Sequence, residues 1–183
     1  MTTSLWSQSP VSRLRDSGPW RVFMSHTADL RQHPADRSFI DAAEAAVIRA
    51  GHAVTDMAYF GARDVRRADY CRAMVERADV YVGVIGARYG VPVTGRPELS
   101  YTELEFETAT AAALPRLVFL VRDGAPSLPA LSQPEAHRSR QRAFRRRLRA
   151  ADVLIRHVTS PADLELELLH ALCELRVASA GCG

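Results

Sequence analysis

Residues 100–121, SYTELEFETATAAALPRLVFLV, predict a helix that leads directly into a buried strand. Ser100 followed three residues later by Glu103 is a capping box, which marks the start of a helix, and Pro115 ends the helical run at Leu114. The following RLVFLV is a short apolar run of the kind found in strands that are covered on both faces. A helix joined to such a strand is typical of α/β proteins.

The glutamates of this helix are expected to differ in their surroundings. At about 100° per residue, Glu103 and Glu107 share one face, which we expect to be solvated. Glu105 points roughly 200° away from Glu103, onto the apolar stripe that contains Tyr101 and Ala109. A carboxylate on the packing side of a helix needs an explanation, either as part of a site or as half of a buried ion pair.

The rest of the chain alternates apolar runs with helical segments, the pattern of a parallel sheet covered on both faces. We expect further strands at 20–25, 52–57, 79–86 and 152–158, and further helices at 34–51, 66–78, 137–150 and 160–178. Five βα units with right-handed crossovers predict an α/β, flavodoxin-like three-layer sandwich with strand order 2-1-3-4-5. The expected domain covers residues 19–178, with flexible tails at 1–18 and 179–183.

The composition is that of an ordinary globular protein. The chain has 183 residues, of which 47% are hydrophobic and 25% charged, enough for one domain with a full core. It contains neither an apolar run of membrane-spanning length nor a signal-peptide pattern, so we expect a cytoplasmic protein. Cys71, Cys173 and Cys182 lie far apart and show no metal-ligand spacing, so we predict no metal site and expect Cys71 and Cys173 to line the core.

An arginine-rich segment raises the possibility of nucleic-acid binding. Residues 137–150 contain seven arginines, and the whole chain has no lysine. Against nucleic-acid binding, Phe144 is the only aromatic residue interleaved with the arginines, and the arginines are spread around the predicted helix rather than gathered on one stripe. We therefore interpret the segment as a solvated helix face, with an acidic partner or nucleic acid as the alternative.

In sheets of this order, ligands bind beyond the carboxyl ends of the strands, between the first and third strands. Three loops reach that point: 25–30, 58–64 and 86–105. The last of them delivers Glu105 to the rim of the expected pocket. The alternative is a buried ion pair between Glu105 and Arg88 or Arg63, which would gain little stability after desolvation.

The other candidate residues of these loops carry weaker signals. Ser25 and Thr27 are placed either to hold a phosphate or to cap a turn. His26 could titrate near neutrality. Expected binding residues with no motif of their own are the stacking surfaces Phe60, Tyr89 and Tyr101, the loop glycine Gly86, and Arg88.

Several enzyme classes are disfavoured because their motifs are missing from the sequence. It contains no Walker A loop, no GxGxxG after the first strand, no HExxH and no GxSxG. A phospho-receiver domain shares the strand order, but it needs an acceptor aspartate at the carboxyl end of the third strand and a lysine later in the chain. This chain has Asp79 at the start of that strand and contains no lysine.

Four blocks of sequence carry a family resemblance. RVFMSHTADL (21–30), AYFGARD (58–64), DVYVGVIGARYG (79–90) and SYTELEFETA (100–109) resemble a TIR-like domain family that is usually found at the N-terminus of bacterial STAND-type NTPases and repeat proteins. The match covers about residues 20–175. More distantly, the chain is similar to TIR domains that hydrolyse NAD and to nucleoside 2-deoxyribosyltransferases.

The resemblance implies a catalytic role for one glutamate. In both distant relatives, a glutamate four residues before a small residue, on the helix after the third strand, works on an N-glycosidic bond. Glu105 with Ala109 has that spacing, whereas Glu103 with Glu107 does not. TIR enzymes tend to carry Trp or Cys just before the glutamate, where this chain has Tyr101 and Thr102. That departure bears on the substrate more than on the fold.

These observations lead to one principal hypothesis and three alternatives. The principal hypothesis is a nucleotide N-glycosidase that hydrolyses NAD, as substrate and not as cofactor, with Glu105 as the catalytic carboxylate. The resemblance implies activity as a homo-oligomer, with a fused or associated sensor or STAND NTPase in a bacterial defence or signalling system. The alternatives are a non-catalytic self-association module, a deoxyribosyltransferase-like enzyme, and a nucleic-acid-binding protein that uses residues 137–150.

Overall fold

The described part of the structure, a computed structural model, comprises residues 14, 18–56, 67–125 and 132–181. One parallel sheet is formed by β1 (Arg21–His26), β2 (Ala53–Asp56), β3 (Val80–Ile85), β6 (Arg116–Val121) and β7 (Leu154–Val158). Its order is β2-β1-β3-β6-β7. Counted along the chain, these strands have the order 2-1-3-4-5, so the predicted flavodoxin-like sheet is confirmed.

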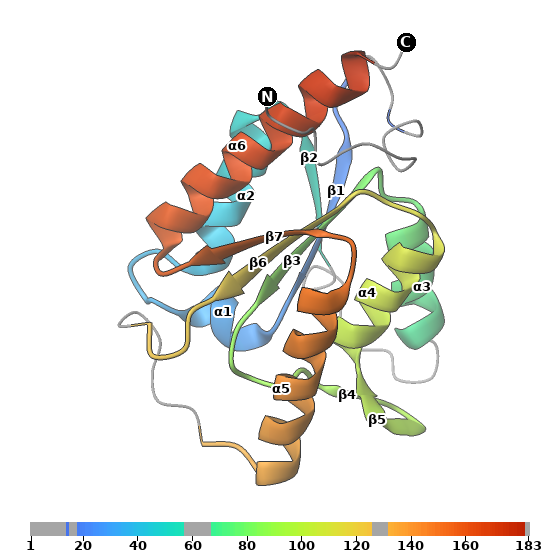
Figure 1. Cartoon of the computed structure of the whole chain (residues 1–183), viewed down its shortest axis with the longest axis vertical. Helices are drawn as coiled ribbons and strands as arrows, with labels where there is room; N and C mark the ends of the chain where they lie inside the picture. The colour runs from blue at the N-terminus through green and yellow to red at the C-terminus, as the bar shows by residue number, and fades with distance from the viewer. Residues whose placement is uncertain (1–13, 15–17, 57–66, 126–131, 182–183) are drawn as a thin grey trace.

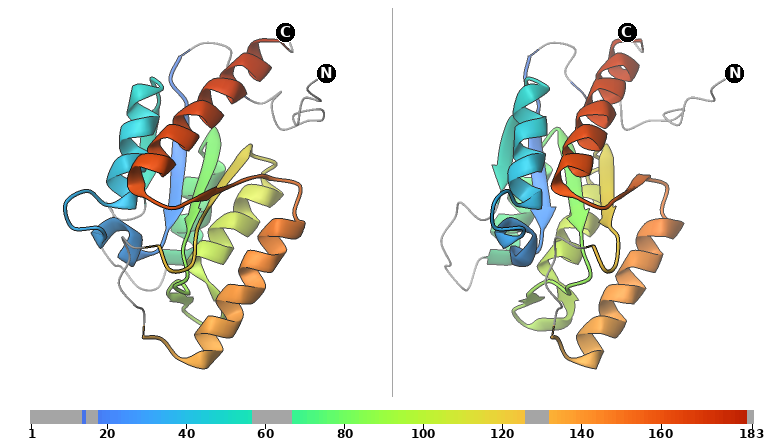
Figure 2. Two further views of the ribbon diagram at one scale, coloured as in Figure 1. Left: turned by 60° about the vertical axis from the view of Figure 1, so that its left-hand side comes forward. Right: turned by 90° about the vertical axis from the view of Figure 1, so that its left-hand side faces the viewer.

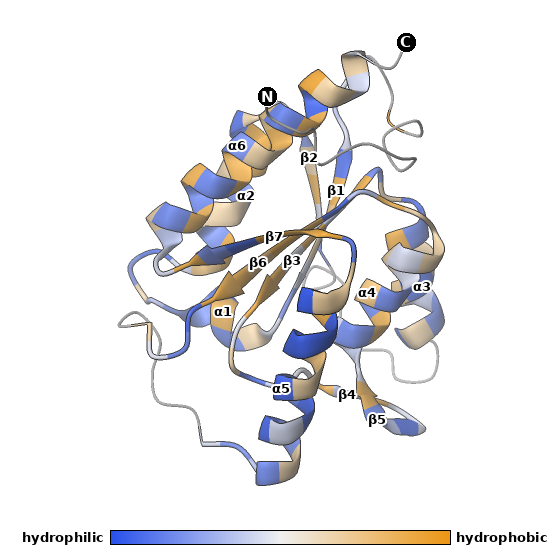
Figure 3. Ribbon diagram, viewed as in Figure 1, coloured by the Kyte–Doolittle hydropathy of each residue, from blue (hydrophilic) through white to orange (hydrophobic). Residues whose placement is uncertain are grey.

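Helices cover both faces of the sheet. On one face α2 (Phe39–Arg49) packs beside α6 (Pro161–Ala180), and on the other lie α3 (Arg67–Glu76), α4 (Tyr101–Ala111) and α5 (Glu135–Ala150) (Figures 1 and 2). Successive side chains of β3 alternate between the two faces, since Val82 joins the core with α2 and α6 whereas Tyr81 packs with α3 and α4. The central strands are accordingly hydrophobic and α5 is mostly hydrophilic (Figure 3).

Two small features were not predicted from the sequence. One is α1 (Ala28–Gln32), a single short helix directly after β1. The other is a hairpin of β4 (Pro92–Val93) and β5 (Arg96–Ser100), in which Gly95 adopts the left-handed conformation of a tight turn, with φ +79°. Both are too short to produce a periodic pattern, and α1 forms part of the wall of the pocket described below.

Several predicted boundaries are wrong for local reasons. Helix α2 begins at Phe39 rather than Pro34, because Ser38 and Asp41 form a capping box there. The capping box predicted at Ser100 is present, but α4 ends at Ala111 and Ala113 has a left-handed φ of +52°, so the helix stops before Leu114. At the C-terminal end, α6 continues to Ala180, two residues past the predicted helix end at 178.

The expectation that the α5 arginines form a solvated face is only partly correct. Arg145 is buried, and it donates to Asp123 at 2.7 Å and to the Val121 carbonyl at 3.1 Å. Arg147 forms an ion pair with Glu103 of α4. The helix is therefore fastened to the body of the domain by two of its arginines.

The two described cysteines have different surroundings. Cys71 on α3 is buried as expected, but Cys173 on α6 is exposed, so its predicted place in the core is wrong. The reason is that Cys173 faces away from the side of α6 that packs on the sheet, which is formed by Leu168, Leu172 and Leu175. Among the described residues, no helix combines the length and apolar character needed to cross a membrane.

Candidate active site

Glu105 is held inside the protein by three separate elements. It lies in the second turn of α4, and only 6% of its surface is exposed. The Ser25 hydroxyl, from the end of β1, donates to Oε2 at 2.5 Å, and the Cys71 thiol of α3 donates to Oε1 at 3.4 Å. The inward orientation expected from helix periodicity is therefore present.

No described residue forms an ion pair with this carboxylate, although the charge of His26 acts on it at longer range and lowers its pKa. None of the described arginines lies within ion-pair distance of Glu105, and Arg88 lines the pocket without contacting the carboxylate. Arg63, the other proposed partner, lies outside the described residues. Burial raises the pKa of Glu105 from 4.5 to about 7, against the opposing effect of the Ser25 and Cys71 hydrogen bonds. Glu105 is thus partly protonated at neutral pH.

Two buried groups beside Glu105, Cys71 and Tyr81, are protonated. Burial, and then the charge of Glu105, raise the pKa of the Cys71 thiol and of the Tyr81 hydroxyl far above their ordinary values. Cys71 is consequently a thiol that donates a hydrogen bond and not a reactive thiolate. Tyr81 lies over Gly83, where an added Cβ would come within 3.0 Å of the phenol, so the strand needs glycine there.

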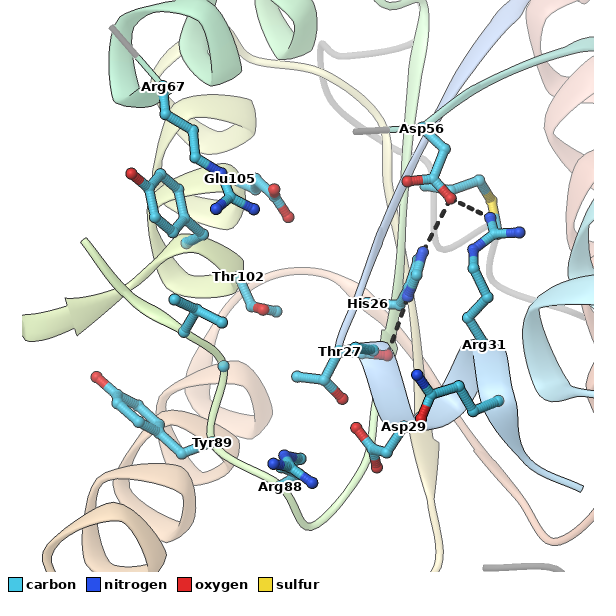
Figure 4. A pocket seen from close by; sticks show the side chains of 16 residues that line it. His26, Thr27, Asp29, Arg31, Asp56, Arg67, Arg88, Tyr89, Thr102 and Glu105 are labelled. Atoms are coloured by element: carbon cyan, nitrogen blue, oxygen red, sulfur yellow. Dashed lines mark hydrogen bonds and ion pairs between the residues drawn. The ribbon is translucent and has the colours of Figure 1, made fainter. Parts of the chain in front are cut away.

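A pocket opens beside Glu105 at the carboxyl ends of the parallel strands. It has a volume of about 490 Å³, in the range of small-molecule sites, and its wall contains residues of β1, α1, β2, α3, α4 and the loop after β3. Figure 4 shows Glu105 and Thr102 on one side and His26, Thr27 and Asp29 on the other. This is the position at which the sheet order predicts a ligand.

His26 forms a charged pair on the β1 side of the pocket. Its Nε2 lies 2.9 Å from Oδ2 of Asp56, and its Nδ1 lies 3.0 Å from the Thr27 carbonyl oxygen. Burial alone would lower the pKa of His26, but the hydrogen bond and charge of Asp56 outweigh it and the pKa is raised. Both ring nitrogens face acceptors, which fits a protonated imidazolium. Arg31 also binds Asp56.

The loop after β3 supplies the opposite rim. Gly90 allows it to approach α4 closely, because a Cβ at this position would lie 2.7 Å from Thr102 Oγ1. The Tyr89 hydroxyl donates to Glu103 Oε2 at 2.7 Å, so this tyrosine braces the rim. The guanidinium of Arg67 lies over the Tyr101 ring, 4.8 Å from its centroid, and therefore occupies one face of a predicted stacking surface.

The predicted site residues are only partly brought together. His26, Thr27, Arg88, Tyr89, Tyr101 and Glu105 line the pocket, and Ser25 lies behind Glu105 as its hydrogen-bond donor. Gly86 does not line it: its carbonyl accepts from Gln141 at 2.6 Å and its Cα faces Leu30. Phe60 lies outside the described residues.

The expectation for Glu103 is wrong. Only 5% of its surface is exposed, because it accepts hydrogen bonds from Tyr89, Arg147 and the backbone N–H of Ser100. Both sides of α4 are therefore covered, by the sheet on one side and by α5 with the β3 loop on the other. Glu107, the second glutamate of that face, is exposed as predicted.

Sequence analysis missed six polar pocket residues, namely Asp29, Arg31, Gln32, Asp56, Arg67 and Thr102. Asp29 belongs to the SHTADL loop that sequence analysis directed to this point. Its position two residues after Thr27 was the available signal. The described residues contain no group of three or more His, Cys, Asp or Glu side chains that could hold a metal ion.

The family of the chain follows from its sequence. Residues 21–173 match the family model described as a domain of unknown function, DUF4062. The chain belongs to this family. The matched range contains every described residue of the DUF4062 pocket. No curated protein matches the chain.

Three solved structures match the chain at low sequence identity, and one of them reaches a TM-score of 0.50. The flavodiiron core of Flv1 from Synechocystis sp. PCC6803 is 12% identical with a TM-score of 0.50, over 91% of this chain and 38% of that one. A CMP N-glycosidase, BcmB, from Clostridium botulinum is 15% identical with a TM-score of 0.49, over 81% and 96%. A prokaryotic SEFIR domain is 16% identical with a TM-score of 0.39, over 70% and 91%. At these identities the likeness concerns the fold alone.

Proposed function

We propose that this DUF4062 domain hydrolyses the N-glycosidic bond of a nucleotide, with NAD as the substrate and Glu105 as the catalytic carboxylate. The observation that carries the proposal is the state of Glu105: it is buried at a pocket wall, it is held by two uncharged donors, and no described residue forms an ion pair with it. A structural carboxylate would be expected to have a cationic partner. A carboxylate kept without one is available for charge that develops in a bound substrate.

The chemistry needs such a group. When the bond between ribose C1′ and the nicotinamide nitrogen breaks, its electron pair leaves with nicotinamide and the ribose becomes oxocarbenium-like. A nearby carboxylate stabilises the positive charge, and the interaction is strong because a buried carboxylate lies in surroundings of low dielectric constant. Water then attacks C1′ and releases one proton, which gives ADP-ribose. The ionised form of Glu105 is the one that stabilises the transition state.

The rim suits a substrate that carries phosphates. Arg67 and Arg88 line the pocket on either side of the α4 N-terminus, and neither forms an ion pair within the described residues. Arg67 is additionally held over the Tyr101 ring. Guanidinium groups bind phosphate oxygens with two parallel N–H donors, so these two arginines would hold the diphosphate of NAD while the ribose lies toward Glu105.

The test is to incubate concentrated protein with NAD, separate the products, and compare Glu105→Gln and Glu105→Ala with the parent. Loss of one such electrostatic stabiliser typically lowers the rate by about 10²–10³, and we expect a fall of that order. Glu107→Gln is the matched control, because Glu107 is exposed on the same helix. If Glu105→Gln consumed NAD at the parent rate, Glu105 would not be the catalytic residue.

The resemblance to TIR enzymes determines the conditions of this assay and the alternative functions that it must distinguish. Such enzymes act as oligomers, so the measurement belongs on the full chain at high concentration or on a forced oligomer. A fused or associated sensor or STAND NTPase would supply the clustering in a bacterial defence or signalling system. Exchange of nucleobases with NAD untouched would instead indicate a deoxyribosyltransferase-like enzyme. Signalling that survives Glu105→Ala would indicate a self-association module.

A further inference from the structure

Asp29 is a buried carboxylate without a partner among the described residues. It lies in the first turn of α1, lines the pocket, and has only 4% of its surface exposed. No described residue donates a hydrogen bond to either of its side-chain oxygens or forms an ion pair with it. Burying such a group costs free energy that nothing within the described protein offsets. Its position is therefore explained by a ligand and not by the stability of the fold.

Thr27 adds a second unpartnered group on the same wall. It is the N-cap residue of α1, but its side chain makes no cap hydrogen bond, and its buried Oγ1 has no partner among the described residues. The capping role that sequence analysis kept open for Thr27 is thus absent. Figure 4 shows Thr27 and Asp29 close together, across the hollow from Thr102 and Glu105.

The chemistry of the two groups indicates what they bind. Asp29 offers only acceptors, whereas the Thr27 hydroxyl both donates and accepts. A cationic ligand is disfavoured because Arg67 and Arg88 line the same pocket, and a phosphate would be repelled by Asp29 and attracted to those arginines. Adjacent hydroxyl groups satisfy both side chains, since two hydroxyls can donate to the carboxylate while one accepts from Thr27.

We infer that Asp29 and Thr27 bind the vicinal diol of a sugar phosphate, so that the pocket selects ribonucleotides over 2′-deoxyribonucleotides. This inference rests on the proposed function, whose substrate class it names. In this arrangement the α1 wall binds the sugar hydroxyls, Arg67 and Arg88 bind the phosphate, and Glu105 lies at the anomeric carbon. A site built to accept hydrogen bonds from hydroxyls rejects an analogue that lacks one, because a buried polar group is left unpaired.

The experiment compares the binding of ribose 5-phosphate and 2-deoxyribose 5-phosphate to the full chain by NMR titration. Neither sugar has an N-glycosidic bond, so the result does not depend on catalysis. We expect ribose 5-phosphate to bind about 10- to 100-fold more tightly, the range for a hydrogen bond to a charged group. Asp29→Asn should abolish most of this preference and Thr27→Val should reduce it. Asp69→Asn, at an exposed acid of α3, is the control that should keep it.

Thermal unfolding separates a ligand role from a structural one. Removing an unpartnered buried carboxylate should leave the melting temperature of Asp29→Asn unchanged or higher. Equal binding of the two sugars, failure of ribose 5-phosphate to bind, or an unaltered ratio in both variants would overturn the inference, as would unfolding of Asp29→Asn. If the sugar preference is present while NAD stays intact, the inference stands and the proposed hydrolysis fails.

Discussion

Replacing Glu105 by Gln should stabilise the protein at alkaline pH, and the size of the effect follows from its burial. The pKa of Glu105 is about 7 in the folded protein, against an ordinary value of 4.5. Between these values the folded state holds a proton that the unfolded chain has released, so the free energy of unfolding falls as pH rises from 4.5 to 7 and changes no further above 7. Each pKa unit corresponds to about 1.4 kcal/mol, so the ionised carboxylate costs about 3 kcal/mol above pH 7.

Glutamine removes this cost and keeps most of the local contacts. Its amide oxygen still accepts from the Ser25 hydroxyl, and its NH₂ group faces the weakly accepting Cys71 sulfur. We therefore expect Glu105→Gln to be about 2–3 kcal/mol more stable than the parent above pH 7 and nearly equal to it near pH 4.5. A change of this sign is unusual, because most substitutions of buried residues destabilise.

The measurement is urea unfolding of both proteins at a series of pH values. The difference between the two curves reports the ionisation of Glu105 together with its charge interaction with His26, because the remaining titrating groups are common to both proteins. Glu107→Gln should differ from the parent by a small amount that does not vary with pH. A flat difference for Glu105→Gln, or a parent that is the more stable protein at pH 8, would mean that the folded carboxylate has a cationic partner. The account of the site would then be wrong.

Three further predictions concern activity and the α4 helix. If the ionised form of Glu105 is the catalytic form, kcat/KM for NAD should rise about tenfold per pH unit below pH 6 and level off above pH 7. A kcat/KM that falls over this pH range would contradict the assignment. Ser25→Ala removes a donor that lowers the pKa of Glu105, so the midpoint of the same profile should move to higher pH; an unmoved midpoint would show that the 2.5 Å contact is unimportant in solution. Glu103→Ala should cost about 3 kcal/mol in urea unfolding, because it removes the Glu103 half of the α4 capping box together with the charge-assisted bonds from Tyr89 and Arg147, whereas a cost near 1 kcal/mol would match loss of the capping-box bond alone.

The sequence specified the fold and the orientation of Glu105 because both depend on local patterns. Alternation of apolar runs and helices is sufficient to predict a parallel sheet, and a 3.6-residue period is sufficient to separate Glu105 from Glu103 and Glu107. The period gives only relative directions, however. It does not tell whether the second face of α4 is also covered, and that face is in fact covered by residues far along the chain, such as Arg147.

For a related reason, the polar pocket wall opposite Glu105, which contains Asp29, could not be predicted from the sequence. A lone aspartate after a strand is normally a turn or cap residue, and only the assembled pocket shows that Asp29 fills neither role. Arg67 likewise begins α3 in sequence but acquires its position from Tyr101, a residue of α4. These properties arise from tertiary contacts between segments that carry no mutual signal in a single sequence.

The burial of Glu105 depends on β1, α3 and α4 remaining packed together, since each of these elements covers part of its side chain. Any loosening that admits water to this spot returns the side chain toward its ordinary acidity, and at neutral pH the domain then releases a proton as it opens. Closure and protonation are consequently linked. A mildly acidic medium would favour the packed arrangement, and an alkaline one would favour hydration around Glu105.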